Sequence, residues 1–170
     1  MSAQRMPGQQ MPGQQMSAQQ DGNGSRIVAG IDGSPSSMDA LQWAIGQAGL
    51  TGAAVDAVIA WHYPAAVGGF GYTPVDMMQT GSDFEEIAQK IVADAVSNAT
   101  DRSGDVRVHP RVIEGNPARV LLDAAAGADL LVVGSRGHGG FTEALLGSVS
   151  QHCVHYAPCP VVVIRGQAGH

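Results

Sequence analysis

The chain has 170 residues, of which 44% are hydrophobic and 14% are charged, and its formal net charge is −6 at pH 7. A chain of this size and composition suits one globular domain, and no apolar run approaches the roughly 18 residues that predict a membrane span. The acidic balance argues against a general nucleic-acid binder. Two cysteines are too few for a disulfide framework and no apolar segment marks a signal peptide, so we expect a cytoplasmic protein.

The N-terminal segment 1–25 differs in composition from the rest of the chain. It reads as short repeats of Met, Gln, Pro and Gly without helical or strand periodicity. This composition cannot bury a core and predicts disorder, and the segment either tethers a partner or has little selected role. We therefore expect a disordered tail over 1–25, one domain over 26–166 and a short C-terminal tail over 167–170.

From residue 26 onward, strand-like and helix-like segments alternate. Ser34-Pro35 and Asn116-Pro117 each place a capping residue before a proline, which predicts the start of a helix. The predicted strands are 26–32, 54–62, 106–114, 129–133 and 160–165, and a third helix is predicted over 118–126. Apolar residues at steps of three and four predict three further buried helix faces: Met38, Leu41, Ile45 and Ala48; Phe84, Ile87, Ala88, Ile91 and Ala95; and Val149, Cys153 and Tyr156.

Strands joined by helices in this way predict an α/β domain with an open five-stranded parallel sheet, right-handed crossovers and helices on both faces. Ligands on such sheets bind beyond the carboxyl ends of the strands, where the strand order reverses. Asp32 ends the first predicted strand and Gly134 follows the fourth. Both are therefore candidates for a site at that edge. The segment 63–81 either covers such a site or is a plain surface excursion.

The stretch from Gly134 to Ser148, GSRGHGGFTEALLGS, directly follows the fourth predicted strand. Glycines at Gly134, Gly137 and Gly147 give the spacing G-2x-G-9x-G, followed by a hydroxyl. Glycine permits positive φ and close approach of backbone amides to an anion, and the helix start adds unpaired N–H groups, so the pattern predicts a phosphate-binding loop. The alternative is a glycine-rich turn that only packs a helix against a strand. No lysine follows these glycines as a P-loop requires, and Thr142 stands where the dinucleotide fingerprint needs glycine.

This spacing closely resembles the nucleotide-binding signature of the universal stress protein family, G-2x-G-9x-G-[ST]. Three further stretches resemble the same family: VAGIDGS at 28–34, EGNPA at 114–118 and CPVVVI at 159–164. The resemblance covers about residues 25–165. It implies an adenine nucleotide alpha hydrolase-like fold with strand order 3-2-1-4-5, and an ATP-binding stress-response protein.

Carried over by position, the resemblance assigns candidate nucleotide-binding residues. Asp32 is expected near the ribose or a metal-bound water, or it instead caps the helix that starts at Ser34. The backbone of Ala60 is expected to contact adenine, and Arg136 either neutralises a phosphate or is a solvated loop charge. A bound triphosphate would bring Mg²⁺, held mainly by its own oxygens and by water. The full set is Gly30, Asp32, Ala60, Val133, Gly134, Ser135, Arg136, Gly137, His138, Gly139, Gly147, Ser148 and Val149.

The implied function is that of an ATP-binding regulator in a stress response, whose nucleotide occupancy changes its dimer or partner state. One alternative is a slow ATPase or adenine-nucleotide hydrolase, although the sequence shows no readable Ser-His-Asp pattern and only Asp32 is a candidate to position water. The other alternative is a nucleotide-free dimeric interaction protein. The resemblance also implies a homodimer through the last strand, whose apolar run at 161–164 lies at the edge of the sheet.

Overall fold

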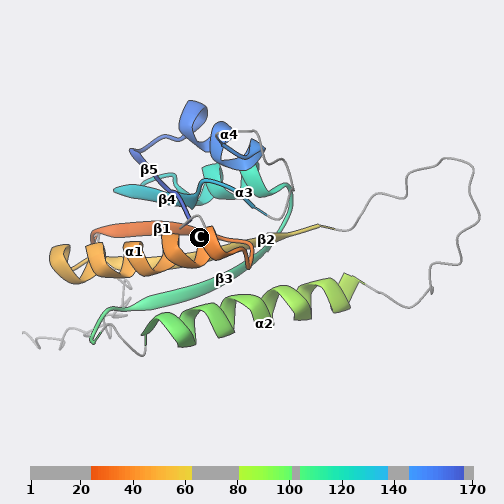
Figure 1. The fold of residues 1–170 in the computed structure, drawn as a ribbon, viewed down its shortest axis with the longest axis horizontal. Helices are drawn as coiled ribbons and strands as arrows, with labels where there is room; N and C mark the ends of the chain where they lie inside the picture. The colour runs from red at the N-terminus through yellow and green to blue at the C-terminus, as the bar shows by residue number, and fades with distance from the viewer. Residues whose placement is uncertain (1–23, 63–80, 101–103, 138–145, 167–170) are drawn as a thin grey trace, which may run out of the picture.

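The computed structural model describes residues 24–62, 81–100, 104–137 and 146–166, which form a five-stranded sheet and four helices (Figure 1). Residues 1–23 of the predicted N-terminal tail, the predicted C-terminal tail and most of the segment 63–81 lie outside the described residues. The predicted tail ended two residues too late, because the Ser25 hydroxyl donates a hydrogen bond to Asp129 at 2.9 Å and the Ser25 carbonyl accepts one from the Ala54 N–H at 2.9 Å. The strands are β1 (Arg26–Ile31), β2 (Ala54–Trp61), β3 (Val108–Glu114), β4 (Leu130–Gly134) and β5 (Val161–Ile164). The helices are α1 (Pro35–Thr51), α2 (Gly81–Thr100), α3 (Pro117–Ala124) and α4 (Ser148–Tyr156).

The strand order is β3-β2-β1-β4-β5 and every pairing is parallel, which confirms the predicted sheet. In the middle of the sheet, Val28 of β1 pairs with Asp56 of β2 on one side and with Leu131 of β4 on the other. The strand order reverses between β1 and β4. The carboxyl ends of these two strands therefore border the position at which open α/β sheets bind ligands.

The helices form one layer on each face of the sheet. α1 and α2 pack against the face that carries Ile27, Ala29 and Ile31 of β1, whereas α3 and α4 pack against the face that carries Val28. Figure 1 shows α4 at the top of that view and α2 at the bottom, beside β3. Side chains alternate between the two faces along a strand, and both faces are covered here, which explains why β1 is apolar at almost every position.

Helices α1 and α3 both begin at the predicted capping residues. The Ser34 hydroxyl accepts a hydrogen bond from the Ser37 N–H at 3.3 Å, and the Asn116 side chain accepts one from the Arg119 N–H at 3.2 Å. Caps of this kind stabilise a helix by about 1 kcal/mol. A proline follows each cap, at a position where an N–H would have no partner within the helix.

Two predicted helix faces are wrong at one residue each. Ile87 is 51% exposed because it lies one residue before the buried stripe of α2, which starts at Ala88. Tyr156 is 68% exposed because α4 is short and buries only Ser150 and Cys153 fully. Element ends also differ from the prediction by one or two residues: β3 starts at 108 rather than 106, and α3 ends at 124 rather than 126.

One buried acid, Asp56, lies at the amino end of the sheet. Its carboxylate accepts hydrogen bonds from Arg26 at 2.9 Å and Arg111 at 3.4 Å, and it lies 3.3 Å from Nδ1 of His109. Burial by itself raises the pKa of Asp56, but the hydrogen bonds from Arg26 and His109 and the charges of both arginines hold that pKa below its ordinary value of 3.8.

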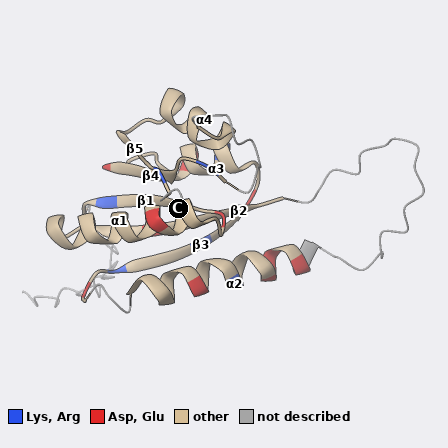
Figure 2. Cartoon of the chain, in the orientation of Figure 1, with Lys and Arg blue, Asp and Glu red and all other residues tan. Residues whose placement is uncertain are grey.

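Elsewhere, acidic positions recur along α2 (Figure 2). Among the described helices, none combines the length and apolar character that crossing a membrane requires.

Candidate functional site

A cavity of about 490 Å³ opens at the carboxyl ends of β1, β2 and β4, which is the predicted position. Its remaining walls come from the starts of α1, α3 and α4 and from the loop that follows β4. The structure thus brings together most of the predicted site residues in its lining. These are Gly30, Asp32, Ala60, Val133, Gly134, Arg136, Gly137, Gly147, Ser148 and Val149.

Three predicted residues do not line the cavity in the described part of the chain. His138 and Gly139 lie outside the described residues. Ser135 is buried, and its backbone connects three elements: its N–H donates to the Ile164 carbonyl at 2.7 Å, and its carbonyl accepts from the Gly147 N–H at 2.8 Å. The Ser150 hydroxyl donates to the same carbonyl at 3.2 Å. Ser135 therefore joins the end of β4 to β5 and to the start of α4.

Several apolar lining residues were missed because they resemble core residues in the sequence. Val58 lies two positions before Ala60 and so points to the same face of β2, and Leu121 lies one turn after Pro117 on α3. These spacings can be read from the sequence, but the same spacings occur for residues that line a cavity and for residues in a packed core. The residues missed are Ile31, Ser37, Val58, Pro117, Leu121, Leu146, Ser150 and Gln151.

The inner part of the cavity is apolar and tightly bounded. Val58 and Ala60 of β2, Leu121 of α3 and Val133 of β4 contribute to its wall. A Cβ atom on Gly30 would lie 2.9 Å from Leu121 Cδ1 and 3.4 Å from Val133 Cγ1. A Cβ at this position would force the end of the Leu121 side chain to shift, so Gly30 lets Leu121 pack closely against the sheet. An apolar interior with a polar mouth is typical of small-molecule sites.

Helix α4 begins at the mouth of the cavity and differs from α1 and α3 because no side chain of the described residues caps it. Its N-cap residue is Gly147, whose own N–H is used by Ser135. Within the described part of the chain, no acceptor meets the N–H groups of Ser148 and Val149, and the first turn carries no acidic residue. Free amides and the positive end of the helix dipole make this start suited to an anion.

Among the described residues that line the cavity, Asp32 is the only carboxylate and Arg136 is the only cation. Asp32 Oδ1 accepts a hydrogen bond from the Ser34 N–H at 2.9 Å. This contact is an Asx turn that precedes α1. Asp32 does not cap the helix as the alternative supposed, because the N-cap residue is Ser34, whose own side chain accepts from the Ser37 N–H. Because Asp32 also borders the cavity, a role toward a ligand stays a prediction. Arg136 is exposed.

For two of the three loop glycines the structure shows a steric reason that the sequence did not predict. Gly134, Gly137 and Gly147 all have φ outside the positive region, so the expectation of positive φ is wrong for them. Instead, a Cβ on Gly134 would lie 2.8 Å from the backbone of Ser36, and a Cβ on Gly137 would lie 2.5 Å from Asp32 Oδ2. A Cβ on Gly147 would meet only ordinary contacts, at 3.6 Å or more.

The described residues contain no group of three His, Cys, Asp or Glu side chains that could hold a metal ion. On α4, His152 and His155 are exposed, and His155 Nδ1 lies 2.8 Å from the Gln151 carbonyl. Burial raises the pKa of the Cys153 thiol to about 11, so this thiol is neutral and unreactive at physiological pH.

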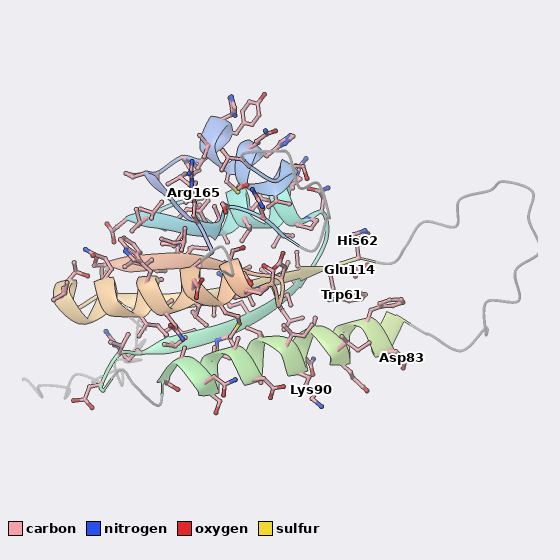
Figure 3. The ribbon with its side chains drawn as sticks, in the orientation of Figure 1. Trp61, His62, Asp83, Lys90, Glu114 and Arg165 are labelled. Carbon is pink, nitrogen blue, oxygen red and sulfur yellow. The ribbon has the colours of Figure 1, made fainter. Side chains whose placement is uncertain are left out.

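Trp61 lies beside the predicted adenine-contact residue Ala60 but packs away from the cavity. It contacts the core cluster on the α1/α2 face, whereas Ala60 packs on the α3/α4 face. Figure 3 shows Trp61 near Glu114, its register partner at the end of β3. Trp61 is therefore a packing residue, and the backbone of Ala60 stays the candidate for contact with a base.

Comparison with known proteins places this fold and cavity in a family. The model of the Universal stress protein family matches residues 24–165. A universal stress protein of Mycolicibacterium smegmatis is 37% identical over 139 residues, which cover 82% of this chain and 45% of that protein. The chain therefore belongs to the universal stress protein family, and it spans about half the length of the curated relatives it matches.

Solved structures of family members share the fold. A universal stress protein in complex with cAMP is 25% identical, with a TM-score of 0.62 over 85% of this chain and 98% of that chain. The universal stress protein from Archaeoglobus fulgidus in complex with dAMP is 24% identical, with a TM-score of 0.59 over 82% of this chain and 97% of that chain. The sheet described above is accordingly the adenine nucleotide alpha hydrolase-like sheet of these relatives.

Proposed function

We propose that this chain binds an adenine nucleotide, ATP in particular, in the cavity at the carboxyl ends of β1, β2 and β4. The observation that carries the proposal is the uncapped start of α4, which lies beside the loop at Gly137 at the mouth of a cavity with an apolar interior. Unpaired amides favour a phosphate and apolar walls favour a base. The relative in complex with cAMP supports an adenine nucleotide as the ligand class.

In this proposal the two parts of the cavity hold the two parts of the ligand. The base lies between Val58, Ala60 and Leu121, with the backbone of Ala60 offering hydrogen bonds. The phosphates lie at the N–H groups of Ser148 and Val149. Arg136, which is exposed at the mouth, supplies a positive side chain, the one that the described part of the lining offers. Together these groups complement an anion attached to an apolar ring.

The lining fits Mg²⁺ only as a companion of the nucleotide. Asp32 is the single carboxylate that the described lining residues offer, and Mg²⁺ bound to a nucleotide commonly keeps several waters and takes one or two protein carboxylates. The ion would neutralise phosphate charge. Asp32 would hold a water or the ion itself, while its Oδ1 continues to accept from the Ser34 N–H.

Isothermal titration calorimetry on the full chain tests the proposal. We expect saturable binding of ATP, tighter with Mg²⁺ than without it, and weaker binding of adenosine, which lacks the phosphates. If neither ATP, AMP nor adenosine binds at millimolar concentration, the chain is a nucleotide-free interaction protein instead. The alternative of slow hydrolysis is tested in the same samples by chromatography, because a regulator leaves ATP intact for hours.

We further propose that the chain forms a homodimer through β5, and the two edges of the sheet support this choice. The carbonyls of Pro160 and Ile164 accept hydrogen bonds from β4, so the backbone groups of Val161 and Val163 point away from the sheet. At the other edge, Arg107 accepts from β2, so the outward positions of β3 include Pro110, which has no N–H to offer.

The β5 edge is therefore open to pairing, whereas the β3 edge is interrupted by a proline. The side chains of Val162 and Val163 both pack on the monomer, one on each face of the sheet, so a charge at either position would disturb the fold. A better test is Val163→Pro, which removes an outward N–H that the sheet does not use.

We expect light scattering to show a dimer for the wild type and for the matched control Val163→Ala, and a monomer for Val163→Pro. A wild-type monomer at tens of micromolar, on the order of a usual working concentration, would refute the dimer.

A further inference from the structure

Two hydroxyl groups from the start of α1 converge on one backbone carbonyl in the loop that follows β4. The Ser36 hydroxyl donates to the Arg136 carbonyl oxygen, and the Ser34 hydroxyl donates to the same oxygen at 3.3 Å. Both serines are buried, with exposed fractions of 7% and 4%. A carbonyl held by two buried hydroxyls has a fixed direction, here toward α1 and away from the start of α4.

This direction also fixes the next N–H. In a trans peptide the C=O and the following N–H point in opposite directions, and the described residues contain no cis peptide bond. The N–H of Gly137 therefore points away from the serines. Its nitrogen lies close to the start of α4, 3.7 Å from the position that a Cβ on Gly147 would take. Gly137 thus adds a third amide to those of Ser148 and Val149 at the mouth of the cavity.

The peptide between Arg136 and Gly137 needs such a restraint. Rotation of this peptide changes φ of residue 137, and glycine accepts φ of either sign at little cost. In the rotated arrangement a carbonyl oxygen would face the phosphates in place of an N–H. Ser36 cannot easily yield, because it is packed between two glycines: a Cβ on Gly134 would lie 2.5 Å from its Oγ, and a Cβ on Gly166 would lie 3.2 Å from its Cβ.

We propose that Ser36 is a positioning residue for the phosphate end of the nucleotide site, because it holds the Arg136–Gly137 peptide with its N–H toward α4. This inference rests on the nucleotide binding proposed above. It goes beyond that proposal because Ser36 lies outside the cavity lining and acts through the backbone of the loop.

The test is a ligand series measured by calorimetry on wild type and on Ser36→Ala. Loss of one amide hydrogen bond to a charged group should weaken ATP and AMP binding about tenfold or more. Adenosine has no phosphate to meet the Gly137 N–H, so its affinity should stay within about twofold. Equal losses for all three ligands would overturn the inference, because general loosening of the cavity does not distinguish ligands by their phosphates.

Asn116→Ala is the matched control, since it removes the cap of α3 and leaves the loop untouched. It should destabilise the fold without any loss that depends on phosphate. A second measurement uses the wild type alone and does not depend on the variant folding: the Gly137 amide proton resonance should shift with AMP and ATP but not with adenosine. An unchanged resonance with bound AMP would overturn the inference, whereas failure of wild type to bind any of the three ligands would refute the proposed function itself.

Discussion

The α3/α4 face of the sheet carries polar groups at both ends, and the two ends differ in whether those groups have partners. At the amino end, the buried carboxylate of Asp56 is surrounded by Arg26, His109 and Arg111. At the carboxyl end, no described acceptor meets the N–H groups of Ser148 and Val149. The polar groups at the amino end are paired with one another, whereas the N–H donors at the carboxyl end are without a described partner.

This difference separates groups that hold the fold from groups that are available to a ligand. A buried acid is tolerated when cations and hydrogen bonds surround it, and removing it leaves those donors unpaired. Free amides at a helix start instead gain a partner only from outside the chain. Substitutions at the amino end should therefore change the free energy of unfolding, and substitutions at the carboxyl end should change ligand affinity.

The largest expected effect on stability is that of Asp56→Ala. It leaves Arg26 without its buried partner and should lower the free energy of unfolding by roughly 1–3 kcal/mol. ATP affinity should stay within about twofold of wild type, since Asp56 does not line the cavity. Urea unfolding and calorimetry measure the two quantities. Asp123→Ala is the control: its exposed partner Arg119 lies 3.9 Å away, and such pairs contribute little. A fall in ATP affinity for Asp56→Ala without loss of stability would contradict the statement that the amino end stabilises the fold and does not contribute to ligand binding.

Gly147→Ala should show the opposite behaviour at the carboxyl end. The added Cβ meets only ordinary contacts, but it occupies the space beside the Gly137 nitrogen, where we place a phosphate. We expect ATP affinity to fall about tenfold or more, about 1.4 kcal/mol, with little change in stability. Gly134→Ala is the contrasting variant: its Cβ would meet the Ser36 backbone at 2.8 Å, and overpacking of this kind destabilises by roughly 1–3 kcal/mol. Unchanged ATP affinity in Gly147→Ala would show that the phosphates lie elsewhere.

Local patterns in the sequence predicted the strands, the helix starts and the loop after the fourth strand, whereas the strand order and most candidate site residues came from the resemblance to a family. Ser34-Pro35 and Asn116-Pro117 marked helix starts, and the glycine spacing after the fourth strand marked the loop. The reason for Gly134 was not predictable, since its neighbour Ser36 is distant in the chain and no pattern connects them. Leu121 was missed for a related reason: an apolar residue at helical spacing has the same signature whether it borders a cavity or a packed core.

A smaller effect on stability is expected from Asn116→Ala at the capped start of α3, and it can be compared with a variant at the uncapped start of α4. Loss of the side-chain cap should lower the free energy of unfolding by about 1 kcal/mol. Ser148→Ala at α4 removes a hydroxyl that caps nothing and should leave stability unchanged within about 0.5 kcal/mol. Chemical denaturation of both variants measures the difference. If both variants lost the same free energy of unfolding, the Ser148 side chain would stabilise α4 through an interaction other than a cap.

The smallest effect is a pH dependence that belongs to the amino end alone. The pKa of Asp56 in the folded chain lies below its ordinary value of 3.8. A carboxyl group of this kind contributes stability that is fully present above its unfolded pKa and is lost as pH falls through its folded pKa. The difference in the free energy of unfolding between wild type and Asp56→Asn should therefore be constant from about pH 7 to pH 5 and shrink below about pH 4. Urea unfolding at a series of pH values measures this difference. If it stayed constant down to about pH 3, the charge of Asp56 would contribute nothing, and the amino end would be held together by packing and neutral hydrogen bonds instead.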